Sequence, residues 1–146
     1  MTLQNLFKIR LLEAHDTDAT QVRRMFESAE RCLADARQES ISSETRLDAA
    51  YRAITQLSTI ALWVNGFRPA KSKPGHHQTM IQSLVHTIGL DRDEMLLFDT
   101  FRVKRNAIDY TGESVDAASV DECIGAAGRL FVCVSQRVAD KFGNIG

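Results

Sequence analysis

The chain has 146 residues, of which 44% are hydrophobic and 25% are charged, which is the balance of an ordinary soluble globular domain. This length predicts a single domain over residues 1–146, with a core large enough to need no stabilising cross-links. The formal net charge of −1 excludes an overall basic field that would favour nucleic acid, although a local basic patch is compatible with it.

The amino-terminal segment MTLQNLFKIRLLEAH predicts a short first helix over residues 3–14. Its apolar runs are too short, and too interrupted by charge, for a signal peptide or a membrane span. We therefore expect a cytoplasmic protein that has no membrane association.

Two amphipathic helices follow this segment. Apolar residues at the i, i+3, i+4, i+7 spacing predict a second helix that begins near Asp18. The stretch QESISSE interrupts the pattern, and Ser42 or Ser43 is a suitable N-cap for a third helix, which Gly66 can close at the C′ position. The segment GFRPAKSKPG, residues 66–75, contains both prolines and is predicted to be the one clear loop.

Two further helices are predicted after the proline loop. HHQTMIQSLVHTIG has the spacing of a short fourth helix that ends at Gly89. Asp91 with Glu94 resembles a capping box and starts a fifth helix, which runs to about Tyr110 before TGES breaks it.

The last predicted helix is long and apolar on one face. Ser119 with Glu122 forms a Ser-x-x-Glu capping box that is predicted to open it, and Gly143 is predicted to end it. No stretch shows the sustained alternation that is typical of a strand. We therefore predict an all-α fold, an up-down helical bundle of four to five main helices.

Cysteine and histidine residues give little sign of a metal site. Cys32, Cys123 and Cys133 have no C-x-x-C spacing and fall at apolar helical positions, which argues against a disulfide framework and against zinc. The adjacent His76 and His77 are better explained by packing or capping at the start of the fourth helix. We expect neither a metal nor a cofactor.

A stripe of polar residues runs along the fifth helix. At about 100° per residue, Arg102, Arg105, Asn106 and Asp109 fall within an arc roughly 100° wide, with Tyr110 at its edge. Apolar residues border the stripe on both sides, namely Leu97, Phe101 and Ile108 on one side and Leu96, Val103 and Ala107 on the other. A helix with two apolar flanks packs on its own bundle and on something else, so we predict a homodimer.

The stripe also has a purely structural interpretation. Arg105 and Asp109 stand at i, i+4, as do Arg102 and Asn106, which is the spacing of ordinary surface pairs worth on the order of a few tenths of a kcal/mol. The alternative is ligand binding, because the two arginines suit phosphate or carboxylate and Asn106 offers both a donor and an acceptor. Spacing leaves both interpretations open.

Three segments of the chain resemble the HEPN family, the small helical bundles of prokaryotes that are associated with nucleotides and RNA. RLDAAYRAITQLSTIALWVNGFRP resembles the family's long helix, with its Tyr-x-Ala centre and its Gly-aromatic-Arg-Pro turn. GHHQTMIQSLVHTIGL resembles the Gly-His-His opening of the next helix in one bacterial branch. RVKRNAIDY resembles the Arg-Asn signature of the penultimate helix, and the likeness extends over about residues 20–140.

The resemblance implies a function as well as a fold. In active members of the family, an arginine followed four to six residues later by a histidine forms a metal-independent ribonuclease site where two copies meet. Other members pair with a small nucleotidyltransferase as toxin and antitoxin. By this match, Arg105 corresponds to the arginine and Asn106 to the residue beside it. The position of the histidine is occupied by Tyr110, preceded by Asp109.

Because the histidine of the active members is missing here, the match favours binding over cleavage. We expect a nucleotide- or RNA-phosphate-binding component of a toxin–antitoxin or RNA-processing system, with Arg102, Arg105 and Asn106 as ligand residues. It would act as a homodimer, and a nucleotidyltransferase-type antitoxin is a candidate partner.

Two alternatives remain open. The first is a metal-independent endoribonuclease whose catalytic residues are Arg105 and Asn106, with Asp109 or Tyr110 in place of the histidine. An unperturbed aspartate, with a pKa of about 3.9, and an unperturbed tyrosine, at about 10, are both poor bases near neutral pH. The second alternative is a non-enzymatic interaction scaffold, in which the polar stripe is a salt-bridge network.

Overall fold

The computed structural model describes residues 2–72 and 74–143, and within these ranges the chain forms six helices and one two-stranded sheet. The elements are α1 (Leu3–Lys8), β1 (Leu12–Ala14), α2 (Ala19–Ala36), α3 (Ser43–Trp63), β2 (Phe67–Pro69), α4 (His76–Thr87), α5 (Arg92–Thr111) and α6 (Ala117–Phe142). The predicted all-α bundle is confirmed. None of the helices within the described ranges has the length and apolarity of a membrane span.

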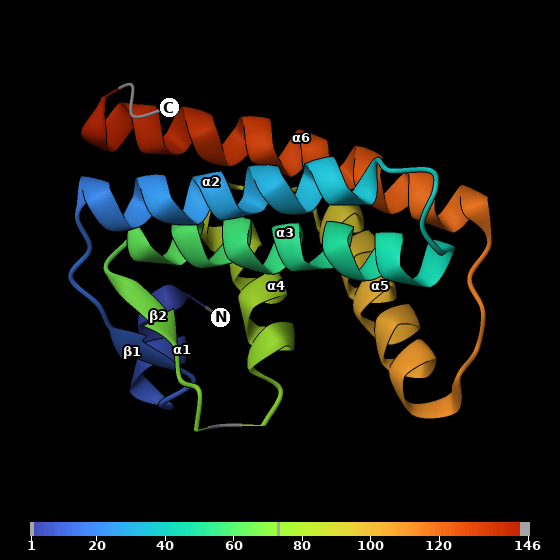
Figure 1. Cartoon of the computed structure of the whole chain (residues 1–146). Coiled ribbons are helices and arrows are strands. Elements are labelled where there is room, and N and C mark those ends of the chain that lie inside the picture. The colour runs from blue at the N-terminus through green and yellow to red at the C-terminus, as the bar shows by residue number, and fades with distance from the viewer. Residues whose placement is uncertain (1, 73, 144–146) are drawn as a thin grey trace.

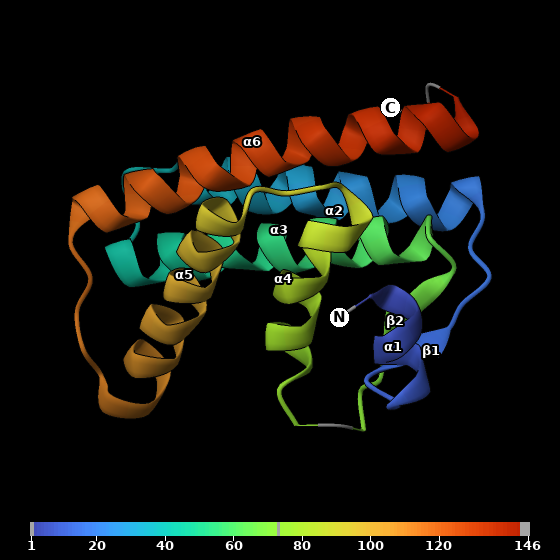
Figure 2. The ribbon, with the colours of Figure 1, turned by 180° about the vertical axis from the view of Figure 1, so that it is seen from behind.

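The three long helices α2, α3 and α6 lie side by side, with α3 antiparallel to α2 and running in the same direction as α6 (Figure 1). The helices α4 and α5 cross this layer steeply, and the carboxyl-terminal part of α5 extends beyond it (Figure 2). Helix α3 is central, because it packs against α2, α4, α5 and α6. This arrangement brings α3, α4 and α5 together on one side of the bundle.

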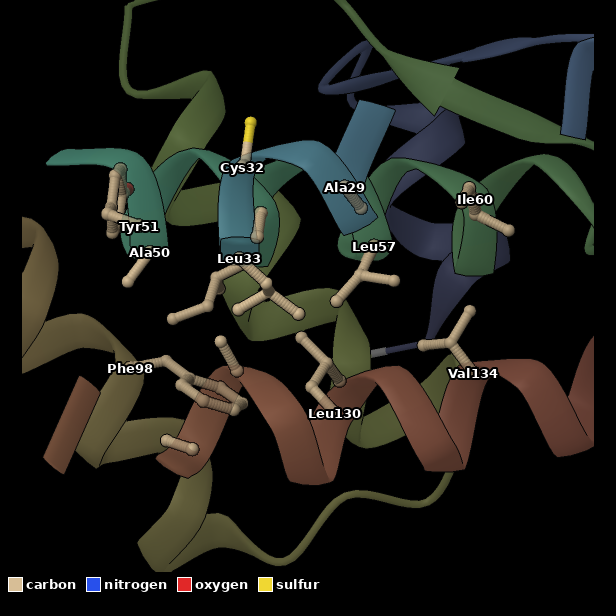
Figure 3. Close-up of a cluster of buried hydrophobic side chains, with 14 of the residues drawn as sticks. Ala29, Cys32, Leu33, Ala50, Tyr51, Leu57, Ile60, Phe98, Leu130 and Val134 are labelled. Carbon is tan, nitrogen blue, oxygen red and sulfur yellow. The ribbon is translucent and has the colours of Figure 1, made fainter. Parts of the chain in front are cut away.

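The core lies between α2, α3 and α6, and the first half of α5 covers one side of it. Leu33, Leu57, Leu130 and Val134 converge from these three helices, and Phe98 reaches in from α5 (Figure 3). Burying apolar side chains of this size contributes about 1.5–3 kcal/mol each. The apolar faces that the sequence predicted for α2, α3 and α6 therefore point into one common core.

The predicted first helix is wrong over its second half. It ends at Lys8, and Arg10 then adopts a left-handed backbone with φ of 65°, which a continuing helix cannot accommodate. Residues 12–14 instead pair antiparallel with β2, with Leu12 opposite Pro69. Strands of three residues are too short to show alternation, so the sequence pattern did not reveal them.

The segment predicted as a loop, residues 66–75, is also partly wrong, because it contains β2. Pro69 is tolerated there because each strand of a two-stranded sheet is an edge strand. The preceding Gly66, with φ of 89°, lies two residues after the C-cap Val64, one position later than predicted. Strand β2 therefore begins as soon as α3 has ended.

Helix starts agree with the prediction at three of the four predicted N-caps, namely Asp18, Ser42 and Asp91. Asp18 and Ser42 are the N-caps of α2 and α3, and their side chains accept from the backbone N–H three residues on, at 2.8 and 3.2 Å. Asp91 is the N-cap of α5, but its side chain makes no cap hydrogen bond, so the predicted box with Glu94 does not form. Gly89 directly follows the C-cap of α4, and Gly143 is the C-cap of α6, as predicted.

The predicted start of α6 is wrong by three residues. Asp116 is the N-cap, and its Oδ1 accepts from the backbone N–H of Ser119 at 3.3 Å. The hydroxyl of Ser119 accepts from Lys104 Nζ at 2.8 Å instead. An aspartate is as good an N-cap as a serine, so the motif that began three residues earlier prevailed.

The Asp116→Ala variant is expected to lower the melting temperature by a few degrees, because the first turn of α6 loses its side-chain acceptor. The Asp116→Asn variant retains an acceptor oxygen and is expected to stay close to the wild type. Thermal unfolding followed by circular dichroism measures both. If Asp116→Ala melts at the wild-type temperature while Ser119→Ala melts lower, the N-cap would be Ser119, as the sequence predicted.

Candidate functional site

The polar stripe lies on α5 where this helix leaves the core. Phe98 and Phe101 are the buried residues of α5 and anchor it to the bundle. Leu97 and Ile108 are partly buried against the core, whereas Leu96 and Val103 are 53% and 54% exposed. One apolar flank of the stripe therefore packs on the bundle, and the other faces solvent in the single chain.

Arg105 links the stripe to α3. Its Nε donates to Asp48 Oδ1 at 2.8 Å, and its Cζ lies 5.5 Å from the centroid of the Tyr51 ring, in cation–π range. Its Nη2 stands 3.8 Å from Asp109 Oδ2, which makes an ion pair that is too long for a strong hydrogen bond. Burial alone would lower the pKa of Arg105, but the hydrogen bond and charge of Asp48 raise it, so the guanidinium stays charged.

Arg102 is held in a similar way within α5. Its Nε donates to Asp99 Oδ1 at 2.7 Å, one helical turn away. That hydrogen bond raises the pKa of Arg102 above its ordinary value. Arg102 and Arg105 both use Nε for an aspartate, and across residues 2–72 and 74–143 their Nη atoms donate no hydrogen bond. The geometry thus orients two guanidinium groups and leaves their terminal donors available.

The formal charges of this cluster balance. Asp48 also pairs with Arg52 at 3.7 Å, so three arginines (Arg52, Arg102 and Arg105) stand among three aspartates (Asp48, Asp99 and Asp109). All these pairs are partly exposed, so each contributes little stability by itself. An anion that binds here gains oriented donors rather than a large positive field.

A tyrosine and a histidine lie against the arginine cluster. Tyr51 is 1% exposed, and its hydroxyl lies 3.4 Å from Nδ1 of His77 at the start of α4. Burial raises the pKa of Tyr51 to about 12, although Arg105 acts in the opposite direction. Burial also lowers the pKa of His77, and the neighbouring His76, Arg105 and Arg102 lower it further. At neutral pH the phenol is therefore protonated and the imidazole is uncharged.

The structure brings together only part of the predicted set of site residues. Arg102, Arg105 and Asp109 lie in one cluster. Asn106 lies on the same helix, partly buried, and its side chain makes no hydrogen bond within the described part of the chain. Tyr110 is 86% exposed, and the described residues show no hydrogen bond or ion pair between it and either arginine.

Five residues of the cluster were not assigned to it from the sequence, namely Asp48, Tyr51, Arg52, His77 and Asp99. His77 does pack at the start of α4, as expected, but it packs on Tyr51. One signal could have found this pair, because a tyrosine on an apolar helix face needs a partner for its buried hydroxyl. The identity of that partner depends on how α4 crosses α3.

Across the described ranges, no three histidine, cysteine or acidic side chains are placed to hold a metal ion together. No family model matches the chain, and comparisons with curated proteins and with solved structures also found no match. The HEPN resemblance therefore stays a prediction based on the three sequence segments.

Stability is expected to fall in mild acid because of His77. Its pKa in the folded state lies below the unfolded value of 6.5, so the unfolded chain binds the proton first as the pH falls. The free energy of unfolding should decrease from about pH 7 downward through 6.5, and the loss is complete once the pH is below the folded pKa. Urea denaturation between pH 5 and 8 should show a shallower acid loss in His77→Gln than in the wild type.

The matched control is His86→Gln on the exposed face of the same helix. This variant should keep the wild-type acid profile. If His86→Gln flattens the profile as much as His77→Gln does, the acid loss does not arise from burial beside Tyr51.

Proposed function

We propose that this chain is a HEPN-like protein that binds the phosphate of a nucleotide or of RNA, with Arg102, Arg105 and Asn106 as its ligand residues. The observation that supports this most strongly is the shared geometry of the two arginines. Each guanidinium is held through Nε by a carboxylate at 2.7 or 2.8 Å, while its terminal nitrogens make no hydrogen bond among the described residues. Pre-oriented guanidinium groups bind phosphate oxygens at little entropic cost.

The same geometry favours binding over the endoribonuclease alternative. Asp109 is half exposed and ion-paired with Arg105, whereas a general base has to be free to accept the proton of the attacking hydroxyl. Tyr110 points to solvent in the single chain, away from the buried face of α5. Neither residue stands in for a histidine beside Arg105 in the geometry of one subunit.

We also propose that the protein acts as a homodimer through α5. Leu96, Val103 and Tyr110 are all exposed and recur every seven residues, so they form one line along the helix. A second copy that packs on this line would bring two polar stripes close to one interface. Participation in a toxin–antitoxin or RNA-processing system, with a nucleotidyltransferase-type partner, follows from the resemblance and is part of the same proposal.

The Val103→Glu variant is expected to weaken the dimer at least about tenfold, because it places a charge in the centre of the apolar line. Sedimentation velocity over a concentration series measures the dissociation constant. Val132→Glu on α6 is the matched control, since Val132 is 56% exposed and lies on another helix. Equal dimerisation of the two variants would contradict an interface on α5.

RNA binding tests the ligand proposal directly. Fluorescence anisotropy with a 5′-labelled single-stranded RNA, in EDTA, should show binding by the wild type that weakens as salt increases. The double variant Arg102→Gln/Arg105→Gln should bind at least about tenfold more weakly, because two phosphate contacts are lost. Arg23→Gln/Arg24→Gln removes two exposed charges from α2 and is the matched control.

The same samples, run on a denaturing gel, separate the alternatives. Intact RNA with the expected loss of binding supports the proposal. RNA cleaved by the wild type, but not by the double variant, would favour the endoribonuclease. Equal RNA binding by the wild type and both double variants would contradict a phosphate site and favour the interaction scaffold.

A further inference from the structure

The hydroxyl of Tyr51 is buried and therefore needs a hydrogen-bond acceptor within the protein. The residue is 1% exposed, and among the described residues the one hydrogen-bond partner of this hydroxyl is Nδ1 of His77, at 3.4 Å. A buried O–H without an acceptor costs about 1–3 kcal/mol. The hydroxyl therefore donates to Nδ1, which has to be unprotonated to accept.

This contact selects one tautomer of His77. A neutral imidazole that accepts at Nδ1 carries its proton on Nε2. The opposite tautomer, with Nδ1–H donating to the phenol oxygen, would leave the hydroxyl proton of Tyr51 without an acceptor. Tyr51 thus makes Nε2 of His77 a hydrogen-bond donor.

Tyr51 contacts both His77 and the arginine cluster. The guanidinium of Arg105 lies over its ring, with Cζ 5.5 Å from the ring centroid, and His77 is hydrogen-bonded to its hydroxyl. Both arginines of the stripe lie close enough to His77 to act on it electrostatically. The His77 ring is partly exposed, and its Nε2 makes no hydrogen bond in the described part of the chain.

We propose that His77 is a third ligand residue, which Tyr51 holds as the Nε2–H tautomer so that it donates a neutral hydrogen bond to a phosphate bound by Arg102 and Arg105. This inference rests on the proposed phosphate-binding function and deepens it. The phosphate then bridges α4 and α5, the two helices that cross the long layer (Figure 2). His77 acts as a donor in this site, and an imidazole in this tautomer and orientation does not present a base to the ligand.

The tautomer can be measured without any ligand. In protein labelled with ¹³C and ¹⁵N at histidine, long-range correlation spectra at pH 7.5 should show His77 as the Nε2–H form. Individual histidine-to-glutamine variants assign the four histidines. The Tyr51→Phe variant should shift His77 toward a mixture of tautomers, and a circular dichroism melt confirms that it is folded. A Nδ1–H form in the wild type overturns the proposal.

Ligand binding is measured by calorimetry with two probes, inorganic phosphate and adenosine 5′-monophosphate. His77→Gln places an amide N–H near the position of Nε2 and should retain most of the affinity. His77→Asn offers Tyr51 an acceptor near the position of Nδ1, but its amide is too short to reach the ligand. His77→Asn should therefore bind about three- to tenfold more weakly, the loss of one hydrogen bond.

The outcomes separate the two proposals. If His77→Asn binds both probes as the wild type does, while Arg102→Gln/Arg105→Gln loses them, the third donor is overturned and the phosphate site stands. If the double arginine variant binds as the wild type does, the phosphate site is overturned, and the role of His77 is overturned with it. Weaker binding by His77→Asn, with rescue in His77→Gln, supports the inference.

Discussion

The Phe98→Ala variant is expected to lower the free energy of unfolding by about 3–5 kcal/mol, the cost of deleting a buried aromatic ring. Phe98 is completely buried and reaches from α5 toward Leu33 and Leu130 (Figure 3). It is also one of two buried anchors of α5, so the cavity lies where the helix that carries Arg102 and Arg105 joins the core. Urea denaturation followed by circular dichroism measures the loss.

Two comparisons make this prediction specific. Phe98→Leu fills most of the space and should cost clearly less than Phe98→Ala. Val132→Ala on the exposed face of α6 should change stability by less than about 0.5 kcal/mol. If Phe98→Ala lowered the free energy of unfolding no more than Val132→Ala does, Phe98 would not anchor α5 to the core.

The Arg105→Ala variant is expected to have the second largest effect, on ligand binding more than on stability. It removes the 2.8 Å hydrogen bond to Asp48 and the cation that covers the Tyr51 ring. These contacts are partly exposed, so the loss of stability should be about 1 kcal/mol. Binding of phosphate should weaken at least about tenfold, because Asp48 and Asp109 keep their negative charge beside the ligand.

Arg105→Lys and Arg129→Ala are the informative controls. Lysine keeps the charge but loses the planar fork, so Arg105→Lys should bind phosphate more weakly than the wild type and better than Arg105→Ala. Arg129 on α6 also forms an ion pair with α5, through Glu94 at 2.9 Å, and its loss should leave phosphate binding unchanged. Calorimetry with inorganic phosphate, together with urea denaturation, measures both effects. Equal binding by Arg105→Ala and Arg129→Ala would contradict the assigned site.

The polar stripe shows how far the sequence pattern reaches. Helical spacing correctly placed Arg102, Arg105 and Asp109 on one face of α5, because residues one turn apart are neighbours in any helix. It also separated the flank of Leu97 from that of Leu96, and the structure partly buries Leu97 and exposes Leu96. The helical period therefore sufficed to assign the residues of α5 to their faces.

Asp48, Tyr51 and His77 join the cluster through contacts between distant segments. Asp48 precedes Arg105 by 57 residues, and Tyr51 precedes His77 by 26. No spacing rule links such positions, because the crossing of α4 and α5 over α3 brings them together. The same limit explains the two-stranded sheet, where pairing of Leu12 with Pro69 follows from the fold and not from alternation within either strand.

The sequence by itself determined the helical class, the main helices with several of their caps, and the two-sided character of α5. These properties follow from local hydrogen bonding and from the apolar period of each helix. Only the tertiary structure decided that Asp48 orients Arg105 and that Tyr51 faces His77. Those contacts exist because a buried polar group takes whichever partner the packed helices place within reach, and packing is a property of the whole chain.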